Sequence, residues 1–496
     1  MSDLVLAIDQ GTTGSTVALM NAEGQLLTSV NHEFPQIFPQ PGWVEHDPEA
    51  IWDSVLKGLK AVFADGLYAV ENVAAIGITN QRETAVLWDA QTGKAIHNAI
   101  VWQCRRTTDV CEQLKADGHE ALIKARSGLV LDPYFSATKF KWLLDHAPDA
   151  QRLLEKGQLR AGTIDSYLIW RLSNAKAHKT DVSNASRTSL MALDSLSWDD
   201  RLLSIFGVPR TILPEICPSS GRFAVTECVP GLPDGVPISG VAGDQQSALF
   251  GQACFAEGDA KCTFGTGSFI LMNAGDAPVA SDNGLLSTVA WQREGQPAVY
   301  ALEGGAFVCG AAVQWLRDQL GIIATAPEVE ALAQSVKDAG GVEFVPALAG
   351  LGAPYWAPEA RGMLCGLTRG SGRGEIARAT LDAMALQNAD ILKAMEQDIG
   401  KAMQSLKVDG GASANNFLMQ LQADYLNRAI TRPEVIETTV AGACFLAGLG
   451  EGVWRSETDV TNVWRADRSF DVEITEEERA ARFSSWQSAV AKTLIN

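Results

Sequence analysis

A pattern of strand, Gly-Thr turn and strand occurs twice in this sequence, about half a chain apart. The first copy lies at residues 6–15 and contains the turn Gly11-Thr12-Thr13-Gly14, and the second lies at residues 261–271 and contains the turn Gly265-Thr266-Gly267. Such an echo predicts a duplication in which two related halves bring their turns face to face. Coincidence is an equal alternative on these residues alone, because Gly-Thr turns are common between strands.

The segments around these turns alternate between strand-like and helix-like patterns, which is typical of α/β layers. Residues 4–8, 15–20 and 25–30 are expected to form three strands joined by tight turns. A helix is expected next, with Asp47 as its N-cap and Pro48 at its first position, and another over residues 376–387. Because 496 residues exceed what one compact core usually holds, we expect two or more domains.

The chain is acidic, with 40 Lys and Arg against 59 Asp and Glu and a formal net charge of −19. This excess argues against nucleic acid or an anionic membrane surface as the main partner, but a small phosphorylated ligand can still be bound by local geometry. No signal peptide or membrane-spanning run is recognised, so we expect a cytoplasmic protein without membrane insertion. The nine Cys and six His lack zinc-binding spacings, which favours buried, reduced thiols.

The first Gly-Thr turn is a candidate phosphate site. Its clustered backbone N–H groups and hydroxyls suit phosphate oxygens, although the chain has no Walker-type loop. Asp9, at the end of the preceding strand, would be costly to bury without a partner, and Mg²⁺ is a natural one. The alternative is a plain hairpin turn in which Asp9 caps neighbouring amides; the second hairpin favours phosphate binding.

Charged residues also follow two other predicted strands. Asp244 follows the apolar residues 238–242 and could take the proton of a hydroxyl that attacks phosphorus, or could simply cap the next helix. Arg82 and Glu83 follow residues 76–81 and could bind vicinal hydroxyls, one donating and the other accepting. An exposed ion pair of little energetic value is the alternative for these two residues.

A glycine pair precedes a predicted helix near the end of the chain. Gly410 and Gly411 would let the backbone approach a flat ligand or a phosphate at the N-terminus of that helix. Helix capping by Ser413 or Asn415 is an equally good explanation of this segment in isolation.

The motifs together resemble a known family. Asp9-Gln10-Gly11-Thr12-Thr13, Gly243-Asp244-Gln245-Gln246, Phe264-Gly265-Thr266-Gly267 and Asp409-Gly410-Gly411 occur in order at matching spacing. With the runs at residues 134–146 and 366–370, they resemble the FGGY carbohydrate kinases of the actin/Hsp70/sugar-kinase superfamily. Residues 80–84, 101–107, 180–188 and 353–356 narrow the resemblance to the members that phosphorylate glycerol, and it covers almost the whole chain.

The resemblance implies an α/β fold of two ribonuclease-H-like domains with an active-site cleft between them. Residues 1–250 would hold the acceptor and the first phosphate hairpin, and residues 251–496 would hold the nucleotide and the second hairpin. The implied enzyme uses ATP and Mg²⁺ to convert glycerol to sn-glycerol 3-phosphate by in-line phosphoryl transfer. Homodimers and homotetramers are usual in this family.

The resemblance also assigns roles by matching position. Asp244 would be the general base, and Asp9 would anchor the metal directly or through water. The acceptor would be held or lined by Arg82, Glu83, Trp102, Tyr134, Asp244, Gln245 and Phe269. The phosphates and the rest of the nucleotide would be contacted by Thr12, Thr13, Gly14, Thr266, Gly310, Gln314, Gly411 and Asn415.

The chain departs from the family pattern in three places. Thr16 stands where the pattern has an Arg that reaches the phosphates, so catalysis is expected to be weaker unless another residue supplies the charge. Residues 231–237 contain no Arg and residues 221–229 no His, which argues against control by fructose 1,6-bisphosphate or by a phospho-histidine. The alternatives are an FGGY kinase for another polyol or a ketopentose, and a catalytically impaired nucleotide-binding regulator.

Overall fold

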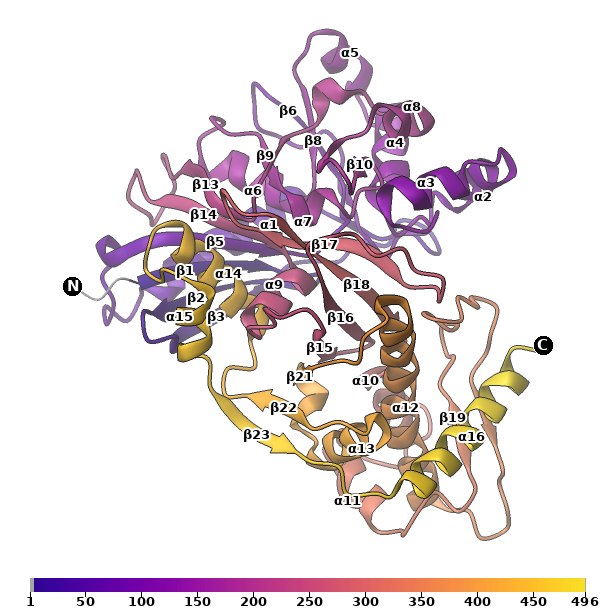
Figure 1. Cartoon of the computed structure of the whole chain (residues 1–496). Coiled ribbons are helices and arrows are strands. Elements are labelled where there is room, and N and C mark those ends of the chain that lie inside the picture. The colour runs from indigo at the N-terminus through magenta and orange to yellow at the C-terminus, as the bar shows by residue number, and fades with distance from the viewer. Residues whose placement is uncertain (1–3, 496) are drawn as a thin grey trace.

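Two twisted sheets form the framework of the computed structural model, which describes residues 4–495 (Figure 1). The first sheet has the order β13-β14-β5-β1-β2-β3. Its strands are β1 (Leu4–Gln10), β2 (Gly14–Asn21), β3 (Leu26–Glu33), β5 (Val73–Asn80), β13 (Ser220–Val225) and β14 (Pro237–Gly243). Strand β1 is antiparallel to β2 and parallel to β5, and β5 is parallel to β14. The three strands expected at the head of the chain are therefore confirmed.

The second sheet has the order β17-β18-β16-β15-β21-β22-β23. Its strands are β15 (Asp259–Phe264), β16 (Ser268–Gly275), β17 (Leu286–Gln292), β18 (Ala298–Ala306), β21 (Ser405–Asp409), β22 (Ile430–Pro433) and β23 (Ala466–Phe470). Strand β15 is antiparallel to β16 and parallel to β21, which in turn is parallel to β22.

The two sheets repeat one topology. The order β3-β2-β1-β5-β14 in the first corresponds to β18-β16-β15-β21-β22 in the second, and an antiparallel strand, β13 or β23, lies beyond the fifth strand of each. The Gly-Thr turns join the second and third strands of each order, β1 to β2 and β15 to β16. This repetition confirms the predicted α/β fold of two related halves.

Helices and small two-stranded sheets surround these two sheets. The helices are α1 (Pro48–Val62), α2 (Thr108–Ala116), α3 (Glu120–Ser127), α4 (Ser136–His146), α5 (Ala150–Glu155), α6 (Ile164–Leu172), α7 (Val182–Ala185), α8 (Asp200–Phe206), α9 (Asp244–Gly251), α10 (Gly310–Asp318), α11 (Glu328–Gln334), α12 (Arg373–Ile399), α13 (Asn416–Leu426), α14 (Thr438–Gly450), α15 (Glu457–Val463) and α16 (Glu476–Thr493). The small sheets pair β4 (Glu45–His46) with β7 (Ala99–Ile100), β6 (Val86–Asp89) with β8 (Leu159–Gly162), β9 (Lys179–Asp181) with β12 (Glu215–Cys217), β10 (Met191–Ala192) with β11 (Ser197–Trp198), and β19 (Glu343–Val345) with β20 (Met363–Cys365).

Both helices expected from the sequence are present. Asp47 caps α1 by accepting a hydrogen bond from the Glu49 N–H at 2.9 Å, and Pro48 is the first helical residue. The apolar face of α1 packs on the side of the first sheet that carries Leu6 and Ile8. The helix expected over residues 376–387 is the central part of α12, most of which is buried in the core of the second half.

Helix α9 follows β14, and helix α14 follows β22. These two helices join the two halves. They pack against each other so closely that a Cβ on Gly442 would lie 1.8 Å from the Ser247 carbonyl oxygen, and one on Gly251 would lie 2.0 Å from that of Thr438. Helix α14 also lies against the first sheet, where a Cβ on Gly77 would lie 2.1 Å from the Ala443 oxygen. The face of β1 that carries Ala7 and Asp9 is therefore directed toward the second half of the molecule.

The cysteines are unpaired, and six of the nine are buried, which agrees with the expected reduced thiols; Cys228 is exposed. Among residues 4–495, no helix has the length and apolar character needed to cross a membrane.

Candidate active site

Three parallel strands of the first sheet, β1, β5 and β14, end at the same edge and bring two acidic groups and one basic group there. Asp9 is near the end of β1, Arg82 follows the end of β5, and Asp244 follows β14 as the first residue of α9. The register aligns Asp9 with Thr79 and Gly243 with Asn80. Arg82 Nε lies 3.1 Å from Asp244 Oδ1 as a result. The structure thus brings together the three strand-end groups that the sequence singled out.

Arg82 is buried and makes its strongest contact with the other half of the molecule. Its Nη1 and Nη2 donate to Glu303 Oε2 at 2.5 Å and Oε1 at 3.0 Å, and Glu303 comes from β18 of the second sheet. Nη1 also donates to Gln246 Oε1 at 3.2 Å. Burial alone would lower the pKa of Arg82, but the carboxylates of Glu303 and Glu83 outweigh it and raise that pKa. The burial excludes the exposed ion pair that was the alternative for Arg82 and Glu83.

Glu83 and Arg187 complete this buried cluster. Arg187 Nε donates to Glu83 Oε1 at 2.7 Å, and its Nη2 donates to Glu303 Oε1 at 3.0 Å. Burial raises the pKa of Glu83, against the lowering effect of Arg82 and Arg187. For Glu303, burial also favours the neutral form, but Arg187 and Arg82 lower its pKa to about 2. Glu83 has a positive φ of 61°, a strained conformation for a non-glycine residue that is often found at functional sites.

Aromatic side chains lie beside the Arg82 cluster. The Trp102 ring packs edge-on against Tyr134 with ring centres 5.6 Å apart, and the Tyr134 hydroxyl accepts a hydrogen bond from Arg82 Nη2 at 3.4 Å. Trp102 Nε1 donates to Thr12 Oγ1 at 3.0 Å, which ties the first Gly-Thr turn to these rings. Phe269, on β16, pairs with Gly305 and so lies on the same face of the second sheet as Glu303.

The second Gly-Thr turn is embedded in backbone contacts from two other segments. The N–H of Gly310, at the start of α10, donates to the Gly265 oxygen at 2.9 Å. A Cβ on Gly310 would lie 2.6 Å from that oxygen, and one on Gly410 would lie 2.7 Å from the Phe264 oxygen. The exposed Thr266 therefore lies between two glycines, Gly310 at the start of α10 and Gly410 directly after β21. A flat or phosphorylated ligand can approach closely at such a backbone site.

The remaining residues of the predicted nucleotide set are placed around this turn. Gln314 is exposed on α10, one helical turn after Gly310, and Gly411 has open space beside it. Asn415 caps α13, since its Oδ1 accepts from the Leu418 N–H at 2.8 Å, whereas the Ser413 hydroxyl donates to the Gly410 oxygen at 2.7 Å. The capping alternative therefore accounts for the side-chain oxygen of Asn415.

Sequence reasoning missed three buried charged residues of this site: Arg187, Lys261 and Glu303. Glu303 is the only charged residue of β18, and Lys261 lies between the buried Ala260 and Cys262 in β15. Lys261 donates from Nζ to Gln245 Oε1 and to Thr263 Oγ1, the latter at 2.9 Å. An ionisable residue inside a predicted buried strand was the available signal, because such a residue needs a partner.

The donor set around Asp9 fits a divalent cation. Burial, followed by the negative charge of Asp244, raises the pKa of Asp9 to about 7, so a nearby cation would stabilise its carboxylate. Among the described residues, no side chain or backbone amide donates a hydrogen bond to the side-chain carboxylate of Asp9. No cluster of three or more His, Cys, Asp or Glu suited to a metal occurs in residues 4–495. The single carboxylate of Asp9 is compatible with Mg²⁺, which commonly uses one or two carboxylates with waters and substrate phosphates.

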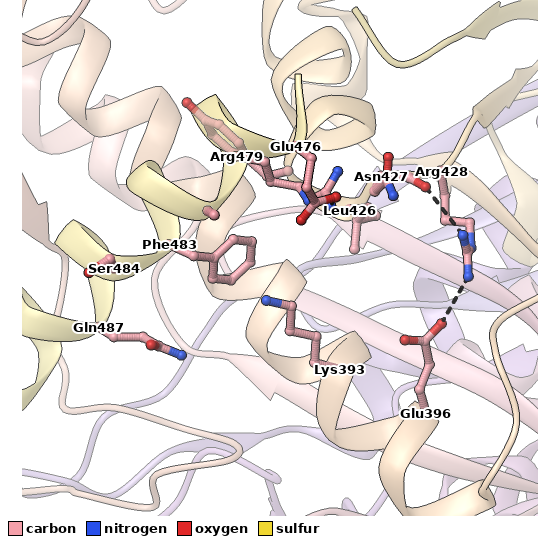
Figure 2. Close-up of a pocket in the computed structure, with 12 residues that line it drawn as sticks. Lys393, Glu396, Leu426, Asn427, Arg428, Glu476, Arg479, Phe483, Ser484 and Gln487 are labelled. Carbon is pink, nitrogen blue, oxygen red and sulfur yellow. Dashed lines mark hydrogen bonds and ion pairs between the residues drawn. The ribbon is translucent and has the colours of Figure 1, made fainter. Parts of the chain in front are cut away.

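A separate hollow of about 500 Å³ lies between α12, α16 and the end of α13 (Figure 2). Its charged lining is already partly paired: Arg428 lies 3.9 Å from Glu396, and Arg479 contacts Glu476. None of the residues assigned above lines it. The candidate active site is therefore the strand-end cluster and not this hollow.

Comparison with known proteins matches nearly the whole chain. The N-terminal domain model of the FGGY family of carbohydrate kinases matches residues 4–251, and the C-terminal domain model matches residues 260–451. Proteins named glycerol kinase from Bdellovibrio bacteriovorus and Symbiobacterium thermophilum are 56% and 53% identical, over 99% and 98% of each chain. The crystal structure of Plasmodium falciparum glycerol kinase with ADP is 35% identical, with a TM-score of 0.94 over 100% of this chain and 99% of that one. A gluconate kinase from Lactobacillus acidophilus shares the fold at 22% identity and a TM-score of 0.88, over 99% and 97%. The chain therefore belongs to the FGGY family of carbohydrate kinases.

Proposed function

We propose that this protein is a glycerol kinase, which transfers the γ-phosphoryl group of ATP to glycerol and forms sn-glycerol 3-phosphate and ADP. The observation that carries the proposal is the pairing of Asp244 with the buried Arg82, 3.1 Å apart, at the strand edge that also bears the first Gly-Thr turn. The relatives of 50–56% identity named glycerol kinase support glycerol as the acceptor.

Asp244 is the proposed general base. Burial raises its pKa, while Arg82 and Lys261 oppose that rise and favour the carboxylate. The carboxylate accepts the proton of a glycerol hydroxyl as the hydroxyl oxygen bonds to the γ-phosphorus and the bond from phosphorus to the leaving oxygen of ADP breaks. Two opposing influences on one carboxyl group suit a base that must take up a proton and then release it.

Arg82 and Glu83 are the proposed partners of the glycerol hydroxyls, because one donates and the other accepts hydrogen bonds. Both are held rigidly by Glu303 and Arg187, so neither has to be ordered when substrate binds. Trp102, Tyr134 and Phe269 are proposed to line the carbon edge, and Gln245 to bind a further hydroxyl. A hydrogen-bonding pocket of this kind rejects analogues that lack a hydroxyl.

Asp9 is the proposed Mg²⁺ anchor, and bound Mg²⁺ would offset the negative charge of the phosphates. The phosphates and nucleotide are proposed to lie between the two Gly-Thr turns, contacting Thr12, Thr13, Gly14, Thr266, Gly310, Gln314, Gly411 and Asn415. We further propose that residues 1–250 provide the acceptor side and residues 251–496 the nucleotide side of an interdomain cleft. A homodimer or homotetramer in the cytoplasm is expected, which light scattering and cell fractionation test.

The function is tested by measuring ADP release from MgATP with a panel of acceptors: glycerol, other polyols and ketopentoses. Glycerol is expected to give the highest kcat/KM, and a ketopentose as the best acceptor would reject the proposal. Nucleotide binding without glycerol-dependent turnover would instead indicate a regulator.

The base assignment is tested with Asp244→Asn, which should lower kcat by about 10³-fold without changing the circular dichroism spectrum. Asp200→Asn is the matched control, because Asp200 is also the first residue of a helix but is exposed. Its activity should equal that of the wild type. Full activity of Asp244→Asn would remove Asp244 from the mechanism.

A further inference from the structure

Lys261 is a buried lysine whose charge favours the Asp244 carboxylate, but whose hydrogen bonds have no role in the proposed mechanism. It lies inside β15, and its side chain is 0% exposed. Its Nζ donates to Gln245 Oε1 and to Thr263 Oγ1, and within residues 4–495 no carboxylate lies within 4.0 Å of it. The ammonium group is therefore held by two neutral acceptors and not by an ion pair.

Such a residue is costly for the fold. Burial lowers the pKa of Lys261, and the negative charges of Asp409 and Asp244 only partly compensate for the loss of water. Its cross-strand partner on the same face of the sheet, Leu271, is a fully buried apolar residue. An apolar side chain of similar length would suit β15 at least as well, because an uncompensated buried charge destabilises a protein. Stability alone does not explain a lysine at this position.

The contact with Gln245 has a definite chemical consequence. An ammonium group can only donate hydrogen bonds, so the amide atom that faces Lys261 must be the oxygen. The amide nitrogen of Gln245 is thereby directed away from Lys261, and it has no hydrogen-bond partner within the described part of the chain. If the amide were turned over, two donor groups would face each other. Lys261 therefore fixes Gln245 as a hydrogen-bond donor beside Asp244.

We propose that Lys261 is a positioning and specificity-determining residue, which holds the Gln245 amide so that its nitrogen donates to a hydroxyl oxygen of the acceptor. The inference rests on the proposed function, in which glycerol is the acceptor and Gln245 contacts it. Donor character at Gln245 complements the acceptor character of Asp244 next to it. Adjacent hydroxyls of a polyol can satisfy both groups, whereas an analogue lacking one hydroxyl leaves one of them unpaired.

The first test replaces Lys261 by methionine, which keeps the length of the side chain but cannot donate. The KM for glycerol should rise about tenfold, while the KM for MgATP should stay within about twofold of the wild type. The preference for glycerol over propane-1,2-diol or propane-1,3-diol should shrink by a similar factor. The thermal unfolding midpoint should stay the same or rise, an outcome that a purely structural lysine would not give.

Lys407 provides a matched control. It lies directly beside Lys261 in the register of β15 and β21, and its Nζ donates to the backbone oxygens of Gln252 at 2.5 Å and Ala253 at 3.2 Å. Lys407→Met should therefore keep the glycerol KM of the wild type. Lys261→Arg, which retains a donor-only cation, should recover part of the glycerol affinity lost in Lys261→Met.

A double-mutant cycle shows whether Lys261 acts through Gln245. In a Gln245→Ala background, Lys261→Met should cause no further rise of the glycerol KM. An unchanged glycerol KM in Lys261→Met, or a full tenfold rise in the Gln245→Ala background, would overturn the inference while leaving the kinase assignment intact. A wild-type protein that does not phosphorylate glycerol would instead overturn the proposed function.

A second comparison applies if Lys261→Met does not fold. Gln245→Glu keeps an acceptor for Lys261 but offers the substrate an oxygen in place of the nitrogen. Its glycerol KM should rise as much as that of Gln245→Ala, and a glycerol KM equal to that of the wild type would rule out the donor role of Gln245.

Discussion

The cluster that joins the two halves makes Glu303→Gln the most informative single substitution. Glu303 accepts two hydrogen bonds from Arg82 and one from Arg187, and it is 2% exposed. Glutamine has nearly the same shape but is neutral, and it turns an NH₂ group toward one of two guanidinium groups. The substitution therefore removes the negative charge and one acceptor while leaving both arginines buried.

The expected loss of stability follows from the pKa of Glu303. The fall from 4.5 to about 2 corresponds to about 3 kcal/mol, at about 1.4 kcal/mol per pKa unit. This agrees with the cost of about 3–5 kcal/mol for removing one partner of a buried ion pair. Because the folded-state pKa is the lower one, the stabilisation is complete above pH 4.5 and is lost as the pH falls toward about 2.

Urea unfolding followed by circular dichroism measures this loss. At pH 7 the free energy of unfolding of Glu303→Gln should be about 3 kcal/mol below that of the wild type, and the difference should narrow below pH 4.5. The glycerol KM should rise about 10- to 100-fold, because Arg82 loses the carboxylate that orients it. Glu343→Gln is the matched control: Glu343 also accepts from both Nη atoms of one arginine, Arg482, but far from the strand-end cluster.

The two variants separate stability from function. Glu343→Gln should lose stability and keep its glycerol KM, whereas Glu303→Gln should lose both. A Glu303→Gln protein with a wild-type glycerol KM and an unfolding free energy within about 1 kcal/mol of the wild type would refute the role given to this cluster.

Three further substitutions test other parts of the structure. Burial and the nearby Asp181 raise the pKa of Asp165 to about 7, so its contribution to stability is largest below pH 3.8 and is lost as the pH rises through about 7. Asp165→Asn should abolish this dependence of the thermal unfolding midpoint on pH. An unchanged pH dependence would contradict the assignment. Gly442→Ala places a Cβ 1.8 Å from the Ser247 oxygen, so it should cost about 2 kcal/mol of unfolding free energy and lower kcat by displacing α9. Gly370→Ala should do neither, because its Cβ would meet only the Thr368 hydroxyl oxygen, at an ordinary contact distance of 3.7 Å. Thr16→Arg restores the cation of the family pattern and should raise kcat/KM for MgATP about tenfold, whereas the control Thr16→Ser should not. No increase in Thr16→Arg would mean that the missing charge does not limit catalysis.

Local patterns were sufficient to predict much of the fold. The turn at residues 11–14 and the alternating segments around it predicted β1 to β3, and Asp47 with Pro48 predicted the start of α1. These features depend on residues that are close in sequence, where spacing and turn chemistry decide the conformation. The strand ends at Asp9, Arg82 and Asp244 were predicted for the same reason.

The connections within the site could not be predicted in this way. Arg82 and Glu303 are 221 residues apart, and Arg187 and Glu83 are 104 apart, so their contacts depend on sheet register and on how the two halves meet. A charged residue in a strand indicates that a partner is needed, but it does not identify the partner. The same holds for Lys261 and Gln245, which lie on different elements and meet only where α9 packs near β15.

The charge balance of the site explains how an acidic chain can bind a neutral acceptor next to a polyphosphate. The site holds three cations and three carboxylates, so a neutral polyol enters without leaving a net buried charge. The cations are Arg82, Arg187 and Lys261, and the carboxylates are Glu83, Asp244 and Glu303. Asp9 is the additional negative group, and its raised pKa indicates that this charge is not balanced by the protein itself. A divalent cation brought in with the nucleotide would provide the balance. The net charge of −19 is therefore no obstacle to phosphate binding, because the proposed contacts with the substrates involve only the few groups at the strand ends.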